Sequence, residues 1–237
     1  MPAPPSMDLS PFKRLREAAV FLHAYRRDLL PFFVVLYTPV ILVRFLVPGV
    51  ESGASDPAAT IPVTALVFDF FYHPIYSGAL IYQLARIEAG EPWSLKQGFV
   101  VGVGLWDKLL LVNIISLLII GAGFLAFIVP AVIAYARLSM VEFRVVVDGD
   151  NPLSALKHSY QMTRADMLPI IGSTSILFMT FILAGLLIDQ MAQALGSNLF
   201  WPVVLDAMLT IAMMLMMTVL LFRFYGLARR RQLIVSS

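Results

Sequence analysis

The sequence of 237 residues contains no cysteine and few charged residues. The absence of thiols excludes disulfides, thiolate metal sites and cysteine nucleophiles, and it argues against redox chemistry. Charged side chains make up 14% of the chain, against about 25% in soluble domains, whereas hydrophobic residues reach 59%. These proportions exclude an ordinary water-soluble domain and predict a membrane protein. No run of like charge indicates nucleic-acid binding.

Six apolar segments are each about long enough to cross a bilayer, which takes roughly 20 residues. They are expected at residues 29–47, 65–86, 109–127, 130–147, 168–188 and 202–222. The predicted fold class is therefore all-α: a polytopic membrane protein with six transmembrane helices.

Three shorter segments precede successive pairs of these runs, and each is introduced by an acceptor or acidic side chain before a proline. The pairs Ser10-Pro11, Glu91-Pro92 and Asn151-Pro152 suit a helix N-cap followed by the first helical residue. In the first segment, apolar residues recur at helical spacing, so the helix is predicted to lie on the membrane. Its basic residues, expected to face anionic head groups, are Lys13, Arg14, Arg16, Arg26 and Arg27.

The order of these segments predicts three repeats of one surface helix followed by two spans. The units are expected at about residues 9–88, 89–148 and 149–231, within a single membrane domain that covers residues 1–237. Such an internal repeat has to be recognised before the fold is interpreted.

An aspartate recurs where each short helix meets the next apolar run. The segments 26–31 and 164–169 share the pattern Arg-x-Asp-x-Leu-Pro, and residues 106–110 form a looser third copy. A carboxylate is favourable at the positive end of a helix, and arginine suits the head-group region. We therefore interpret Asp28, Asp107 and Asp166 as caps at which the chain enters the membrane.

The basic residues outside the spans predict the orientation. They lie in the N-terminal segment, in the two connectors that hold the later surface helices and at the C-terminus, whereas the three opposite loops hold none. The positive-inside rule then places both termini in the cytoplasm. Anionic lipids of the cytoplasmic leaflet are the expected partners.

Ionisable residues inside the predicted spans are candidate functional residues, because each costs roughly 2.5–3.5 kcal/mol or more in hydrocarbon. The candidates are Arg44, Asp69, His73, Arg137, Asp189 and Asp206. Arg44 is the only cation on its side, and we expect it to form a structural ion pair with one of the aspartates. Snorkelling of each group, or an ion or proton path, are the alternatives.

His73 has two possible roles. His73 lies one helical turn from Asp69, so the two could form a proton relay. We favour instead a histidine that is hydrogen-bonded to a neighbouring helix beside Pro74. The fourth span also carries Glu142 and Arg144, so its inner half must face protein, water or head groups.

No catalytic, metal-binding or cofactor-binding residue is predicted. His23 and His158 belong to helices on the cytoplasmic side and cannot converge with His73 on a metal ion. The carboxylates are too scattered to argue for an acid/base pair. The small-residue spacing of Gly98, Gly102 and Gly104 favours close helix packing over phosphate binding. Methionines between residues 208 and 217 are expected to fill the core, with a flexible apolar cavity as the alternative.

Three stretches resemble the YciC family of bacterial inner-membrane proteins: residues 77–84, 127–130 and 152–164. Residues 220–227 fit the same pattern. The family is similar to the membrane domain of some glycerophosphodiester phosphodiesterases. The resemblance implies a six-span protein of the bacterial inner (plasma) membrane with no agreed biochemical activity.

We therefore expect a non-enzymatic integral membrane protein that organises the envelope or lipid bilayer, or that is accessory to a membrane-protein partner. The alternative is a transporter, or a carrier of lipid or small molecules, supported by the internal repetition and by Asp69, His73 and Arg137 in the spans. A membrane-embedded enzyme is a third hypothesis, but no catalytic constellation supports it.

Overall fold

The computed structural model describes residues 10–46, 63–195 and 201–236, and these residues fold into α-helices without a strand. This confirms the all-α prediction. The helices are α1 (Pro11–Ala24), α2 (Arg26–Leu46), α3 (Val63–Ala89), α4 (Leu95–Gly104), α5 (Trp106–Ala126), α6 (Ile128–Leu138), α7 (Val141–Val147), α8 (Pro152–Met162), α9 (Met167–Leu195) and α10 (Trp201–Ser236).

The starts of the short helices follow the predicted pattern in part. The Asn151 side chain accepts a hydrogen bond from the Ser154 amide at 2.9 Å, with Pro152 as the first helical residue of α8. Pro11 begins α1 in the same way, although the Ser10 side chain makes no cap. The expected start at Glu91-Pro92 is wrong, because Ser94 caps α4 through the Gln97 amide.

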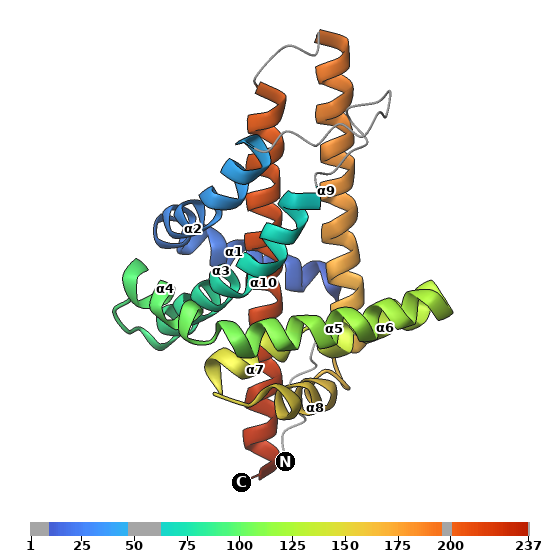
Figure 1. Cartoon of the computed structure of the whole chain (residues 1–237). Helices are drawn as coiled ribbons and strands as arrows, with labels where there is room; N and C mark the ends of the chain where they lie inside the picture. Colours follow the sequence, from blue (N-terminus) through green and yellow to red (C-terminus); the bar gives the residue numbers. More distant parts are fainter. Residues whose placement is uncertain (1–9, 47–62, 196–200, 237) are drawn as a thin grey trace.

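Three of the described helices are long and apolar enough to cross a membrane: α5, most of α9, and α10 over residues 204–232. Figure 1 shows α9 and α10 side by side, whereas α5 and α6 lie crosswise to them. Gly123 of α5 lies so close to Ala131 that α5 and α6 form a tight hairpin. These three helices indicate a membrane protein. Helix α5 lies at a large angle to α9 and α10.

The predicted fourth span is two helices, so a single helix over residues 130–147 is wrong. The chain breaks between α6 and α7 at Ser139 and Met140. The Ser159 hydroxyl of α8 donates to the Arg137 carbonyl at 2.8 Å and accepts from the Met140 amide at 3.3 Å. This side chain satisfies backbone groups that the break leaves without helical partners.

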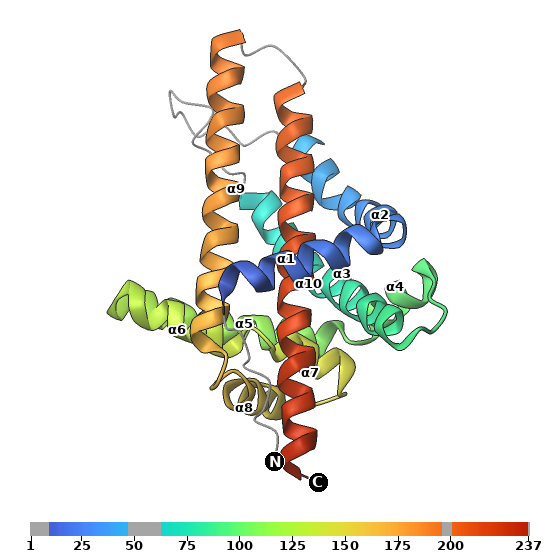
Figure 2. The same cartoon turned by 180° about the vertical axis from the view of Figure 1, so that it is seen from behind.

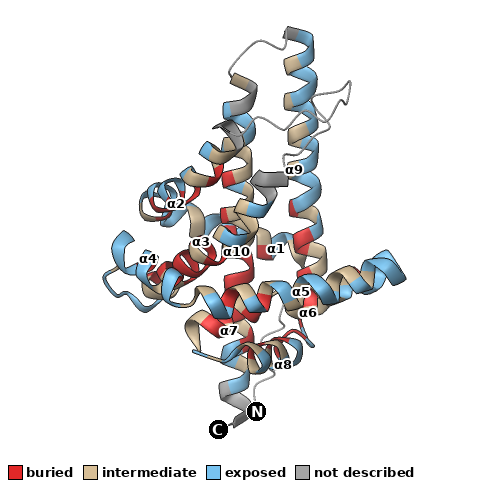
Figure 3. Ribbon diagram, in the orientation of Figure 1, coloured by how far each residue is buried: buried red, intermediate tan, exposed pale blue. Residues whose placement is uncertain are grey.

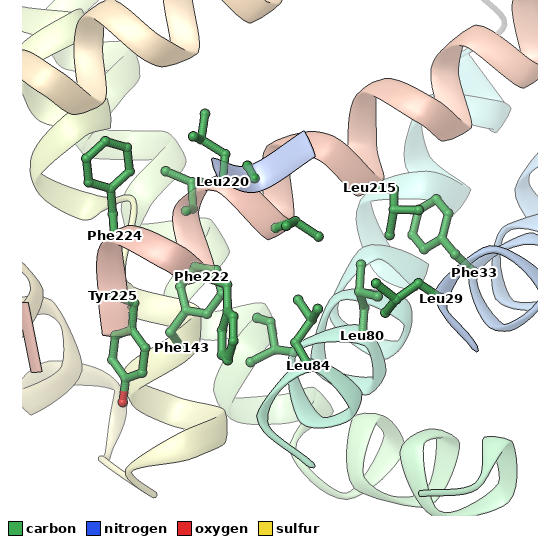
Figure 4. Packing of buried hydrophobic residues seen from close by; sticks show 14 of the residues in the cluster. Leu29, Phe33, Leu80, Leu84, Phe143, Leu215, Leu220, Phe222, Phe224 and Tyr225 are labelled. Carbon is green, nitrogen blue, oxygen red and sulfur yellow. The ribbon is translucent and has the colours of Figure 1, made fainter. Parts of the chain in front are cut away.

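A buried core lies where the middle of α10 meets α2, α3 and α7 (Figure 4). Leu80 and Leu84 of α3 and Leu215 and Tyr225 of α10 are nearly inaccessible to solvent. Figure 3 shows that buried residues gather in this central region, while the far half of α9 is largely exposed and the far half of α10 is mostly intermediate. These far halves are mainly apolar, as expected for surfaces that face lipid.

Helix α1 packs against the protein and does not simply lie on a surface. It crosses α10 and reaches α9, as Figure 2 shows from behind. Ala18 is buried, and Arg14 is only 8% exposed, paired with Glu17 at 3.0 Å. The expectation that Arg14 faces lipid head groups is therefore wrong, because Arg14 lies on the face that packs inward.

Two of the three glycines in α4 permit its close approach to neighbouring helices. A methyl group at Gly102 would overlap the Ile75 carbonyl of α3, and one at Gly98 would meet the Phe32 ring at 2.8 Å. Gly104 has open space around its Cα. The predicted packing role is confirmed for Gly98 and Gly102 and is wrong for Gly104.

Candidate functional site

A partly open cavity of about 250 Å³ with several polar side chains lies between α3, α5, α6, α7 and α10. Seven polar side chains share in lining it: His73, Asn113, Ser116, Tyr135, Ser139, Glu142 and Thr218. The packing of α3, α5, α6, α7 and α10 brings these residues together although they are far apart in the sequence. A concave site with a few convergent polar groups is the usual form of a small-molecule site.

His73 and Glu142 are the ionisable pair of the cavity. The Nδ2 atom of Asn113 lies 3.0 Å from His73 Nδ1, and Glu142 Oε1 lies 3.7 Å from the same nitrogen. Their side chains are 35% and 23% exposed, respectively, so both retain free surface. The Asn113 amide thus joins α5 to the His73 ring of α3, beside the Glu142 carboxylate.

Three of the four hydroxyl groups that line the cavity donate hydrogen bonds to other atoms of the protein. Ser139 donates to the Ala136 carbonyl at 2.9 Å, and Thr218 donates to the Met214 carbonyl at 2.9 Å. Tyr135 donates to the Met217 sulfur at 3.8 Å. Their oxygen lone pairs remain as acceptors. The cavity is therefore rich in acceptors, with the Glu142 carboxylate among them.

An apolar groove of about 400 Å³ continues from this cavity. The two spaces share four lining residues: Ile120, Tyr135, Met214 and Met217. Beyond them the groove is lined by side chains such as Phe124, Phe178 and Met213. Met214 and Met217 pack against the core, as predicted, and also line this groove, which was the alternative. Their flexible thioethers can adapt to different occupants.

The structure places the intramembrane candidates separately, not along one path. The Asp69 carboxylate accepts from the Tyr76 hydroxyl at 3.4 Å, and the carboxylate nearest His73 is Glu142, so the Asp69–His73 relay geometry is not formed. His73 contacts α5 through Asn113, in agreement with the favoured hydrogen-bonded histidine. Arg137 stacks over the Tyr160 ring at 4.8 Å, outside the cavity lining.

The remaining candidates lie away from the cavity. Asp189 and Asp206 are exposed on α9 and α10. The Arg44 side chain lies outside the described residues, so its expected ion pair stays a prediction.

The three helix-start aspartates have different surroundings. Asp28 and Asp107 lie in the first turns of α2 and α5. Asp166 directly precedes α9, and its buried carboxylate accepts a hydrogen bond from Arg231 Nη1 at 2.6 Å. That bond ties the start of α9 to the end of α10, whereas Asp107 is exposed.

A second set of charges, the Arg144 cluster, joins α7, α8 and α10. Arg144 contacts Asp148 at 2.7 Å and donates through Nε to Asp150 at 2.8 Å. His158 of α8 lies 2.8 Å from Asp150. Burial alone would raise the pKa of Asp150, but the bonds from His158 and Arg144 outweigh it and hold this pKa below its usual value.

The same cluster reaches α10 through Asp148. Its carboxylate accepts from the Tyr225 hydroxyl at 2.5 Å and pairs with Arg229 at 3.2 Å. Two elements distant in the sequence are thereby fixed by charge-assisted hydrogen bonds. Arg144 therefore faces protein, one of the surroundings predicted for the charged half of the fourth span.

A basic hollow of about 490 Å³ lies beside α1. Its cations are Lys13 and Arg16 of α1 and Arg223 of α10, and the Arg223 guanidinium stands over the Phe21 ring at 5.6 Å. Val20 and Tyr25 add apolar lining. Sequence reasoning identified the α1 cations, but it missed Arg223, because only the crossing of α1 over α10 brings that residue close.

Sequence reasoning also missed the site role of Asn113 and the partner of Glu142. The available signals were an amide in the middle of an apolar run and a carboxylate that needed a partner. Within the described residues, no group of three or more His, Cys, Asp or Glu side chains is placed to hold a metal ion.

The long apolar helices and the internal charge pairs define an all-helical membrane protein. The chain belongs to the family of a domain of unknown function, DUF7847, which matches residues 93–228 and so more than half of the sequence. The match runs from before α4 into α10 and includes Asn113 and Glu142, but not His73. No curated protein and no solved structure matches the chain. The resemblance to YciC proteins stays a prediction.

Proposed function

We propose that this chain is a non-enzymatic integral protein of the bacterial inner membrane that binds anionic lipid head groups. Through these lipids it organises the bilayer or holds a membrane-protein partner. The observation that carries the proposal is the basic hollow beside α1, where cationic and apolar side chains meet at one place on the surface.

The charge balance of the hollow favours an anionic head group. Lys13, Arg16 and Arg223 supply three positive charges. The one carboxylate in the lining, Glu17, is already paired with Arg14 at 3.0 Å. A lipid phosphate would meet the arginines, and the adjoining apolar side chains would meet the start of an acyl chain.

Other short helices support contact with a membrane surface or a partner. On α8, the apolar Leu153 and Tyr160 are strongly exposed, next to the exposed Lys157. On α4, Phe99 and Val100 are exposed in the same way. Outward faces that combine large apolar residues with basic ones are typical of helices that lie in the lipid interface.

We further propose six membrane crossings in three repeats, with both termini in the cytoplasm. The proposal rests on the basic residues at the end of α10 and on the absence of Lys and Arg from the three opposite loops. Six crossings require the α5–α6 hairpin to turn toward α9 and α10 when lipid surrounds it. The exposed apolar face of α5 would favour that movement.

The lipid proposal is tested by titrating the purified full chain with phosphatidylglycerol or phosphatidylcholine and following bound lipid by native mass spectrometry. Arg16→Gln and Arg223→Gln should each weaken phosphatidylglycerol binding about fivefold, because one basic residue near an anionic surface contributes about 1 kcal/mol. The control is Lys108→Gln, an exposed cation of α5 outside the hollow, which should bind like the unchanged chain. Equal binding of the two lipids, or an equal loss in the control, would contradict the proposal.

A carrier of lipid or small molecules is the second candidate function. The observation in its favour is the cavity at His73 and Glu142, which joins a polar space to an apolar groove. Uptake of a labelled amphiphile into proteoliposomes that Glu142→Gln abolishes would support this candidate. Binding without uptake would favour the organising role.

A further inference from the structure

We propose that the cavity at His73 and its adjoining groove form a binding site for a single-chain amphiphile with a protonated amine head group. The ammonium group would lie against Glu142, and the alkyl chain would occupy the groove toward Phe124 and Phe178. This site is separate from the basic hollow beside α1, and it does not depend on the anionic-lipid role.

The charge of the occupant follows from the surroundings of Glu142. Among the described residues, the only basic group within 4 Å of its carboxylate is the His73 ring. The Nδ2 atom of Asn113 lies 3.0 Å from Nδ1 of that ring, so this nitrogen is already engaged within the protein. A carboxylate in a low-dielectric interior is costly unless a positive charge compensates it, so the site favours a cationic guest over an anionic one.

The hydrogen-bonding chemistry of the cavity points the same way. Ser139, Thr218 and Tyr135 each donate within the protein and offer only lone pairs to a guest. A primary ammonium group carries three donors and no acceptor, so it suits such a site. A phosphate or carboxylate head group would place its negative charge against these three oxygens and beside the Glu142 carboxylate.

The volumes of the two joined spaces and their different linings suit an amphiphile. The polar part holds about 250 Å³ and the apolar part about 400 Å³. Ile120, Met214 and Met217 line both, so one molecule can extend from the first to the second. Flexible methionines at the junction allow chains of different shape.

The test uses the full chain in lipid nanodiscs and three probes of equal chain length: dodecylamine, dodecanol and dodecanoate. Affinity is measured from the change in intrinsic tryptophan fluorescence. We expect dodecylamine to bind at least tenfold more tightly than the other two, since each charge-assisted contact to a carboxylate is worth about a factor of ten or more. Glu142→Gln should remove this preference while leaving dodecanol binding unchanged.

The matched control is Asp206→Asn, which removes an exposed carboxylate of α10 outside the cavity lining. It should keep the amine preference. Equal affinity for the three probes, or an equal loss of preference in Asp206→Asn, would overturn the proposal.

A second measurement needs no substituted protein, so it decides the question even where Glu142→Gln fails to fold. A photoreactive dodecylamine is crosslinked to the unchanged chain, and the labelled peptides are identified by mass spectrometry. Label is expected around Phe124, Phe178 and Met213, and excess unlabelled dodecylamine should remove it. Label confined to the outer faces of α9 and α10 would overturn the site.

Discussion

Replacing Gly102 with alanine should separate α4 from α3. The added methyl group would overlap the carbonyl oxygen of Ile75 and lie 3.3 Å from the backbone nitrogen of Ala79. Both obstacles are main-chain atoms of one helix, so a side-chain rotation cannot relieve them. Overpacking of this kind costs about 1–3 kcal/mol.

The same substitution also stabilises the helix, so its effect is compared with that of a second glycine in α4. Alanine is better than glycine inside a helix by about 0.8–1 kcal/mol. Gly104→Ala lies in the same helix and places its methyl group in open space, so it measures the gain in helix propensity alone. That gain is smaller at Gly104, because Gly104 is the last residue of α4. We expect Gly102→Ala to be less stable than Gly104→Ala by about 1–3 kcal/mol.

The assay is unfolding of the purified chain by SDS in mixed micelles, followed by tryptophan fluorescence. Trp93 packs edge-on against Phe32, with 5.6 Å between the ring centroids. The Trp106 indole donates a hydrogen bond to the Phe71 carbonyl at 2.8 Å. Both indoles flank α4 and should change emission when α4 leaves α3. Equal unfolding midpoints for Gly102→Ala and Gly104→Ala would refute the packing argument.

Two further predictions concern charge pairs. Asp166→Ala should lower the free energy of unfolding by about 1.5–3 kcal/mol, because it removes a charge-assisted hydrogen bond to Arg231. Asp107→Ala, at an exposed site, should lower it by less than about 1 kcal/mol. Unfolding of both variants by SDS measures the difference. The lowered pKa of Asp150 implies stability that is present above the ordinary carboxyl value of 3.8 and is lost as pH falls through the lower folded-state pKa. The advantage of the unchanged chain over Asp150→Asn should therefore be full at pH 7 and should shrink below pH 3.8; an advantage constant down to pH 2.5 would contradict it.

The helices were predictable because each apolar run long enough for a span had to satisfy its own backbone hydrogen bonds. The break at Ser139 and Met140 was not, because it depends on Ser159, a residue of a later helix. The burial of Arg14 was hidden for a related reason. An amphipathic helix has the same sequence pattern whether its apolar stripe meets lipid or α10.

The candidate site was predictable only in its parts. His73 was identified as an ionisable residue in an apolar run, and Glu142 was recognised as a residue that needed protein, water or head groups beside it. Their meeting depends on α3 packing against α7, and the pairing of these helices has no signal in local periodicity. The one-turn spacing instead suggested Asp69 as the partner, although that carboxylate bonds to Tyr76.

The central claim is that α9 and α10 cross the membrane with their basic end in the cytoplasm. Because the chain has no cysteine, single cysteines can be introduced without background. Asp189→Cys on α9 and Lys157→Cys on α8 place thiols at exposed positions near opposite ends of this assembly. A membrane-impermeant maleimide added to intact spheroplasts should label Asp189→Cys at once and Lys157→Cys only after permeabilisation. Labelling of both from the outside, or of Lys157→Cys alone, would contradict the account.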